Sequence, residues 1–199
     1  MNNNTHYIDL VFPIQGKTIP VDHGYALYGA LSRTCPHLHQ SLATAIHLIR
    51  GKYCGEGLLA LSIISRLKLR MPADELPLYL TLAGKSIDVD GHALRLGVPN
   101  PYLLKPKTAV YSHLVTTKNC QEEVRFKAEM EKQMLSLGIE GKLAIGNRRT
   151  FKVHDKQIVG YSVLVTELTA DESLTLQEKG LGGRRKMGCG VFVPVGKEK

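Results

Sequence analysis

A glycine-rich, basic stretch at residues 180–190 could hold a chain of phosphates. It reads GLGGRRKMGCG, and an apolar run at 191–195 follows it. Glycines let a backbone approach a bulky ligand and expose its N–H groups, and cations add affinity for phosphate. The candidate binding residues are Gly180, Gly182, Gly183, Arg184, Arg185, Lys186, Gly188 and Gly190.

The order of elements around this stretch indicates which phosphates it would hold. A dinucleotide fingerprint needs a strand before its glycines and a helix after them. Here a helix-like segment precedes the glycines and a strand-like run follows them. The stretch therefore favours an RNA or DNA backbone over NAD, and a flexible hairpin with solvated charges is the alternative.

The eight histidines are the side chains best suited to moving protons near neutral pH. Cleavage of RNA without a metal ion needs a base for the ribose 2′-OH, an acid for the leaving 5′-oxygen and cations or N–H donors for the phosphorane. Histidine can serve as either the base or the acid. No spaced set of carboxylates resembles a two-metal nuclease. We therefore expect any cleavage to need no metal, and we expect no cofactor.

Composition limits the class of protein. The formal net charge of +8 favours a polyanionic partner such as nucleic acid over an anionic membrane surface. The chain of 199 residues holds no apolar run long enough to cross a bilayer, and its first residues lack the pattern of a signal peptide. We expect a soluble, cytoplasmic protein without a membrane partner.

The first half of the chain has the pattern of alternating strands and helices. Asp22 could cap the first helix, and a hairpin would turn at Asp90-Gly91. The expected elements are a strand at 7–12, a helix at 24–34, strands at 45–49 and 58–71, a helix at 74–83 and a hairpin at 86–96. The order is β-α-β-β-α-β.

The second half repeats that order after a proline-rich connection at 99–107. Val124 and Leu135 are among the residues expected on the apolar side of its first helix, and Thr169 with Glu172 resembles a capping box for its second. The expected elements are a strand at 109–117, a helix at 121–137, strands at 142–153 and 158–168, a helix up to 179 and a last strand. We predict an α+β fold of tandem ferredoxin-like (RRM-like) domains, 1–98 and 108–199.

Three stretches of the sequence together resemble the CRISPR-associated Cas-six endoribonuclease family, in particular its myxobacterial-subtype branch. They are residues 22–33 (DHGYALYGALSR), residues 82–92 and the stretch 180–190 with its final strand. The resemblance implies tandem ferredoxin-like domains and metal-independent cleavage of CRISPR repeat RNA. It also implies 2′,3′-cyclic phosphate and 5′-hydroxyl ends, and a product that stays bound through its 3′ hairpin in a Cascade-type complex.

The same resemblance places the catalytic histidine near the first helix of the N-terminal domain. His23 matches best, and a helix N-terminus would favour a nearby phosphate. His39 and His47 are rivals, and Tyr28 is a candidate assistant. A histidine that only caps the helix or packs beneath it is the alternative for His23, and a core position is the alternative for Tyr28.

RNA binding should then involve the stretch 180–190 together with Arg148 and Arg149 in the second domain. A solvated strand face is the alternative for those two arginines. Aromatic residues are few and tryptophan is absent, which favours recognition by shape and backbone over base stacking. A repeat-RNA-binding subunit without catalysis is the alternative function.

Overall fold

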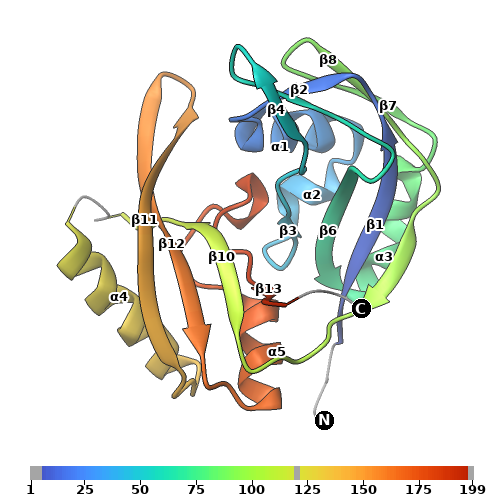
Figure 1. Cartoon of the computed structure of the whole chain (residues 1–199). Coiled ribbons are helices and arrows are strands. Elements are labelled where there is room, and N and C mark those ends of the chain that lie inside the picture. The colour runs from blue at the N-terminus through green and yellow to red at the C-terminus, as the bar shows by residue number, and fades with distance from the viewer. Residues whose placement is uncertain (1–5, 119–121, 197–199) are drawn as a thin grey trace. The chain divides into compact units, whose positions relative to one another are not determined.

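The computed structural model describes residues 6–118 and 122–196. The chain divides into two compact units, Met1–Leu103 and Leu104–Lys199, each of which mixes strands and helices (Figure 1). The boundary falls within the proline-rich connection. Part of that connection is not a free linker, because Asn100–Leu103 forms a strand, β9, that pairs with the first strand of the first unit.

The first unit is built around strand β1, which pairs antiparallel with β6 on one side and with β8 and β9 on the other. The order in this sheet is β3-β6-β1-β8-β7, and a smaller sheet has the order β2-β5-β4. The strands are β1 (Tyr7–Gln15), β2 (Thr18–Pro20), β3 (Ala45–Ile46), β4 (Lys52–Gly55), β5 (Leu58–Ala60), β6 (Arg66–Pro72), β7 (Ser86–Val89), β8 (His92–Leu96) and β9 (Asn100–Leu103).

Alternation along β1 creates the core of this unit. Leu10 and Phe12 point to one face of the sheet and are fully buried, in the same cluster as Leu27 and Leu31 of helix α1. Burying one such side chain stabilises the fold by roughly 1.5–3 kcal/mol. The helical elements are α1 (Gly24–Thr34), α2 (His37–Gln40), η1 (Ala73–Glu75), α3 (Leu76–Tyr79) and η2 (Leu80–Leu82).

Helix α1 has the bounds that the sequence predicts, and so does the hairpin of β7 and β8. The segment expected to be one helix at 74–83 is instead a run of 3₁₀, α and 3₁₀ turns. The strand expected at 58–71 is two strands, β5 and β6. A turn separates them, in which the Ser65 hydroxyl donates to the Arg50 carbonyl and accepts from the Ser62 N–H.

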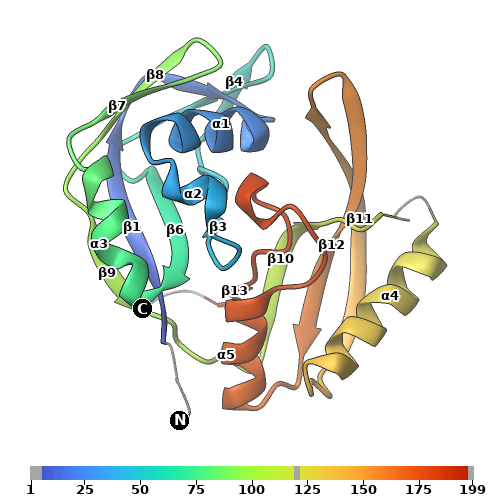
Figure 2. The same ribbon diagram turned by 180° about the vertical axis from the view of Figure 1, so that it is seen from behind.

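The second unit has the element order β-α-β-β-α-β that the sequence predicts, and its sheet has the order β11-β12-β10-β13. Helices α4 and α5 lie against one face of this sheet (Figure 2). The predicted capping box is confirmed, because Thr169 and Glu172 exchange side-chain and backbone hydrogen bonds at the start of α5. The elements are β10 (Val110–Val115), α4 (Glu123–Ser136), β11 (Lys142–Val153), β12 (Lys156–Thr166), α5 (Ala170–Lys179), η3 (Arg185–Met187) and β13 (Val193–Pro194).

Of the four residues expected on the apolar side of helix α4, which include Ala128 and Met134, only Met134 is buried. Phe126, Met130 and Met134, spaced four residues apart, are buried against the sheet. Val124 and Leu135 are instead 81% and 79% exposed. Among the residues that the structure describes, no helix is long and apolar enough to cross a membrane.

Candidate functional site

His23 lies at the start of helix α1 and is almost completely buried. Its Nδ1 is 2.7 Å from the Pro20 carbonyl oxygen, and its Nε2 accepts a hydrogen bond of 2.9 Å from the Ile49 N–H. The ring is therefore the neutral Nδ1–H tautomer, and burial lowers its pKa below the ordinary value. His23 itself occupies the N-cap position, where we expected Asp22, and no side chain caps the helix.

His47 lies just after strand β3 beside a charged pair, and 11% of its side chain is exposed. Its Nε2 is 3.4 Å from Oδ1 of Asp9. The Arg70 guanidinium donates to both oxygens of this carboxylate, from Nε to Oδ1 at 2.7 Å and from Nη2 to Oδ2 at 2.9 Å. Burial lowers the pKa of His47, and Asp9 offsets this only in part. Burial also opposes the charge of Asp9, yet His47 and Arg70 hold the pKa of Asp9 below its usual range. This cluster ties β1 to β6 and to the chain after β3.

His39 and Tyr28 form a pair at a more accessible place. Tyr28 lies on α1 and is half-buried, whereas His39 lies on the one-turn helix α2 and is exposed. The Tyr28 hydroxyl is 2.9 Å from His39 Nδ1, and the two rings are stacked with their centroids 6.3 Å apart and their planes 16° apart. The structure thus brings together two of the four predicted catalytic residues.

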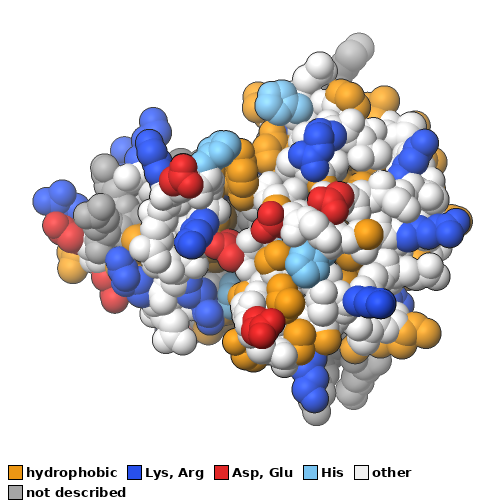
Figure 3. Space-filling model, turned by 90° about the horizontal axis from the view of Figure 1, so that it is seen from above, with side chains coloured by type: hydrophobic (Ala, Val, Ile, Leu, Met, Phe, Trp, Pro, Cys, Tyr) orange, Lys and Arg blue, Asp and Glu red, His pale blue; other side chains and the backbone are white. Residues whose placement is uncertain are grey.

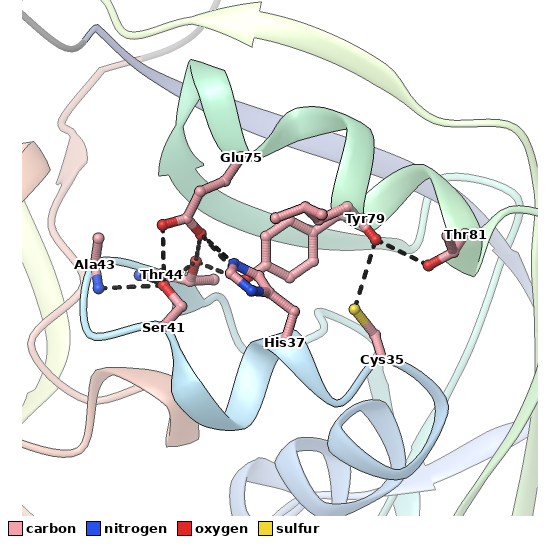
Figure 4. A network of polar contacts seen from close by, with 9 residues as sticks. Cys35, His37, Ser41, Ala43, Thr44, Glu75, Tyr79 and Thr81 are labelled. Carbon is pink, nitrogen blue, oxygen red and sulfur yellow. Dashed lines mark hydrogen bonds and ion pairs between the residues drawn. The ribbon is translucent and has the colours of Figure 1, made fainter.

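A network of polar side chains that the sequence did not reveal lies next to this pair in the chain (Figure 4). His37 is the first residue of α2, and its Nε2 is 3.1 Å from the Glu75 carboxylate. Glu75 follows His37 by 38 residues, so no local spacing could have indicated the contact.

The glycines of the stretch 180–190 are required by its backbone. Gly180, Gly182, Gly188 and Gly190 have positive φ. A Cβ atom on Gly180 would collide with the Gly190 carbonyl, and one on Gly190 would collide with the Leu181 carbonyl. The two ends of the loop therefore approach so closely that only glycine fits at either position.

The N–H groups of these glycines are engaged within the protein. We expected them to be offered to phosphates, but in this conformation each donates to a protein oxygen. The pairs are Gly180 to Leu176 O, Gly182 to Gln133 Oε1, Gly183 to Thr116 O, Gly188 to Arg185 O and Gly190 to Leu114 O. The loop is thus a fixed frame, and what it presents to a ligand is its side chains.

The cations of this loop differ in exposure. Arg184 is exposed in a left-handed conformation, with φ of 60°, whereas Arg185 is half-buried and donates from Nη2 to the Glu178 carbonyl at 2.6 Å. On β11, Arg148 is exposed and Arg149 is half-buried just after an irregularity in the pairing with β12. On the face of the molecule seen from above, Figure 3 shows Lys and Arg side chains spread out rather than gathered in one patch.

Comparison with known proteins identifies the family. Residues 8–197 match the family described as Cas6, "Cas6 Crispr". The chain belongs to the Cas6 family of CRISPR endoribonucleases. It is also 36% identical over 191 residues to the CRISPR-associated endonuclease Cas6 of Myxococcus xanthus strain DK1622, a match that covers 96% of this chain and 83% of the relative.

Solved Cas6 structures share the fold at low sequence identity. A CRISPR-associated protein Cas6 aligns with a TM-score of 0.65 at 14% identity, covering 96% of this chain and 99% of that one. A Cas6-related protein from Pyrococcus furiosus aligns with a TM-score of 0.64 at 13% identity, and the match covers 98% of this chain and 99% of that one. The CRISPR endoribonuclease Cse3, solved bound to a 19-nucleotide RNA, aligns with a TM-score of 0.54 at 11% identity. That match covers 94% of this chain and 98% of the Cse3 chain. The mixed α+β fold of this chain is therefore that of Cas6 and Cse3.

Proposed function

We propose that this chain is a metal-independent endoribonuclease that cuts CRISPR repeat RNA to give mature crRNA, with His39 and Tyr28 at its active site. The observation that carries the proposal is the hydrogen-bonded pair itself, because it couples an exposed imidazole to a hydroxyl in a member of the Cas6 family. The strand orders of the two sheets support a duplicated ferredoxin-like fold as its frame.

The reaction needs proton transfer at two oxygens. The ribose 2′-oxygen attacks the adjacent phosphorus as its proton leaves to a base, and the bond from phosphorus to the 5′-oxygen breaks as that oxygen receives a proton from an acid. The products are a 2′,3′-cyclic phosphate and a 5′-hydroxyl. His39 serves in one of these transfers, and the Tyr28 hydroxyl, hydrogen-bonded to Nδ1, holds the ring orientation and tautomer.

Accessibility favours His39 over the two other histidines. A base or acid must come within hydrogen-bond reach of the RNA oxygen that it serves. His23 holds both ring nitrogens in hydrogen bonds to the backbone, and Nε2 of His47 is buried against Asp9. The lowered pKa values of His23 and His47 also disfavour the protonated form that a general acid needs. In this proposal His23 fixes the start of α1, and His39 performs one of the two proton transfers.

Binding of the repeat uses side chains on the second unit. We assign phosphate contacts to Arg184 and Lys186 and, on β11, to Arg148 and Arg149. The glycines of the loop contribute its shape, and Arg185 holds the loop to the end of α5 in addition to supplying charge. The cleaved RNA stays bound through its 3′ hairpin and carries the protein into a Cascade-type complex.

The test uses purified protein and end-labelled RNA of its own CRISPR repeat in excess EDTA. A matched RNA carries a single 2′-deoxy sugar at the mapped cut. Cleavage of the all-ribose RNA, its loss in the deoxy RNA and a 2′,3′-cyclic phosphate end are the expected results. Tight binding with neither RNA cut would contradict the proposal and favour the non-catalytic subunit, and cleavage of the deoxy RNA would exclude attack by the 2′-hydroxyl.

A further inference from the structure

Glu75 is the centre of a polar network between two segments of the first unit. Its carboxylate lies 3.1 Å from His37 Nε2 and accepts from the hydroxyls of Ser41 at 3.3 Å, Thr44 at 3.2 Å and Tyr79 at 3.4 Å. The Thr44 and Tyr79 hydroxyls are 2.8 Å apart. Burial raises the pKa of Tyr79 to about 12, so its hydroxyl remains a hydrogen-bond donor.

The network holds both ends of helix α2. His37 is the first residue of this one-turn helix, and its ring also packs edge-on against Tyr79, with centroids 5.6 Å apart. Ser41 is the residue that ends the helix, and its hydroxyl accepts from the N–H groups of Ala43 and Thr44. Figure 4 shows these side chains directed toward Glu75 from the segment of α2 and the loop after it.

A helix of four residues does not persist without tertiary contacts. On α2 the side chain of Leu38 is buried in the core, and His37 is bound by Glu75, so two of its four side chains fix its position. His39 lies between the two ends that the network holds and meets Tyr28 of α1. The direction of the His39 ring therefore depends on where the network places α2.

We propose that Glu75 is a positioning residue for RNA cleavage: by accepting from His37, Ser41 and Thr44 it fixes α2, and thereby holds His39 against Tyr28 in the orientation that proton transfer needs. This inference rests on the proposed role of His39. Glu75 takes no part in the chemistry and contacts no RNA.

The test compares Glu75→Gln with Asp74→Asn. Both changes remove one negative charge from the same 3₁₀ turn, but Asp74 is exposed and outside the network. For Glu75→Gln we expect the single-turnover cleavage rate to fall roughly 10- to 100-fold, because a displacement of about 1 Å in a catalytic group costs that much. The affinity for 2′-deoxy repeat RNA should stay within about twofold, and Asp74→Asn should match the unsubstituted protein in both measurements.

A double-mutant cycle separates positioning of His39 from a general loss of structure. In a His39→Ala background, Glu75→Gln should lower the residual rate no further. An equal loss in both backgrounds, or a loss of RNA affinity that parallels the loss of rate, would overturn the proposal. If His39→Ala alone leaves cleavage unchanged, the proposed active site fails, and the next measurement still decides whether Glu75 orients the His39 ring.

That measurement is the ¹⁵N spectrum of the His39 ring, which reports its tautomer and its hydrogen bond to Tyr28 without RNA. Glu75→Gln should change the Nδ1 shift, and Asp74→Asn should not. An unchanged His39 ring in Glu75→Gln would contradict the proposal. Should Glu75→Gln not fold, Ser41→Ala removes one donor to the same carboxylate and should change the Nδ1 shift in the same direction.

Discussion

Three histidines of the first unit show how the surroundings of a residue decide what it can do. The His23 ring bridges the Pro20 carbonyl and the Ile49 N–H, and His47 is enclosed beside Asp9. His39 is exposed and meets a hydroxyl. The resemblance to the Cas6 family ranked His23 first because it starts the first helix. In our proposal burial reverses that ranking, and burial depends on the strands that enclose the residue.

The buried state of His23 predicts how stability depends on pH. Because the folded pKa lies below the ordinary value of about 6.5, the unfolded chain binds the proton first as the pH falls. The free energy of unfolding is therefore highest above that pH and falls below it. For each such histidine the free energy of unfolding changes by at most about 1.4 kcal/mol per pH unit. Urea unfolding at pH 7.5 and pH 5.5 measures the difference in the free energy of unfolding.

The control for this prediction is His23→Gln, which does not titrate. Its stability should fall less between the two pH values than that of the unsubstituted protein, and the remaining fall belongs to His47, whose pKa is lowered too. Equal falls in both proteins would show that His23 is not held neutral by the fold.

Among the elements, the glycine-rich loop is the clearest case in which glycines that the sequence singled out are needed for a different physical reason. The glycines were expected to expose N–H groups, whereas the structure uses those groups internally and needs the glycines for close approach at Gly180 and Gly190. Which oxygens accept from the loop depends on residues such as Leu114 and Gln133, far away in the sequence.

Two glycines of this loop make a matched pair of substitutions. Gly190 has φ of 65° and no space for a Cβ, whereas a Cβ on Gly183 would meet nothing within 4 Å. Gly190→Ala should lower the free energy of unfolding by about 1–3 kcal/mol, the range for strained backbone, and weaken RNA binding, while Gly183→Ala should change neither. Thermal unfolding and a filter-binding titration measure the two effects, and equal behaviour of both variants would contradict the account of the loop.

Other elements show why helix faces and strand ends were harder to predict. Helix α4 offers apolar residues on two sides, and only the sheet decides that Phe126 is buried and Val124 exposed. Strands β5 and β6 form one apolar run in the sequence. The turn between them depends on the Ser65 hydroxyl reaching the Arg50 carbonyl. Local signals that need no partner, such as the capping box at Thr169, were predicted correctly.

At the scale of the whole molecule, the net charge of +8 predicts RNA binding that weakens steeply with salt. Each phosphate contact that is removed should reduce the slope of log K against log salt by about 0.7–0.9. Arg184→Gln, at an exposed loop position, should therefore flatten the slope by about that amount. Lys127→Gln on α4, where the lysine pairs with Glu131, should leave it unchanged. An unchanged slope in Arg184→Gln would remove this residue from the binding surface.

The most direct test of the central claim is the single-turnover cleavage of repeat RNA in EDTA by His39→Ala, compared with His23→Gln and with His6→Ala, an exposed control. We predict that His39→Ala loses at least about 100-fold in rate, the lower limit for general acid–base catalysis, and keeps its affinity for deoxy RNA. His23→Gln should cleave below its unfolding temperature, and His6→Ala should match the unsubstituted protein. Cleavage by His39→Ala at the unsubstituted rate, with loss of cleavage in folded His23→Gln, would contradict the account and place the active site at His23.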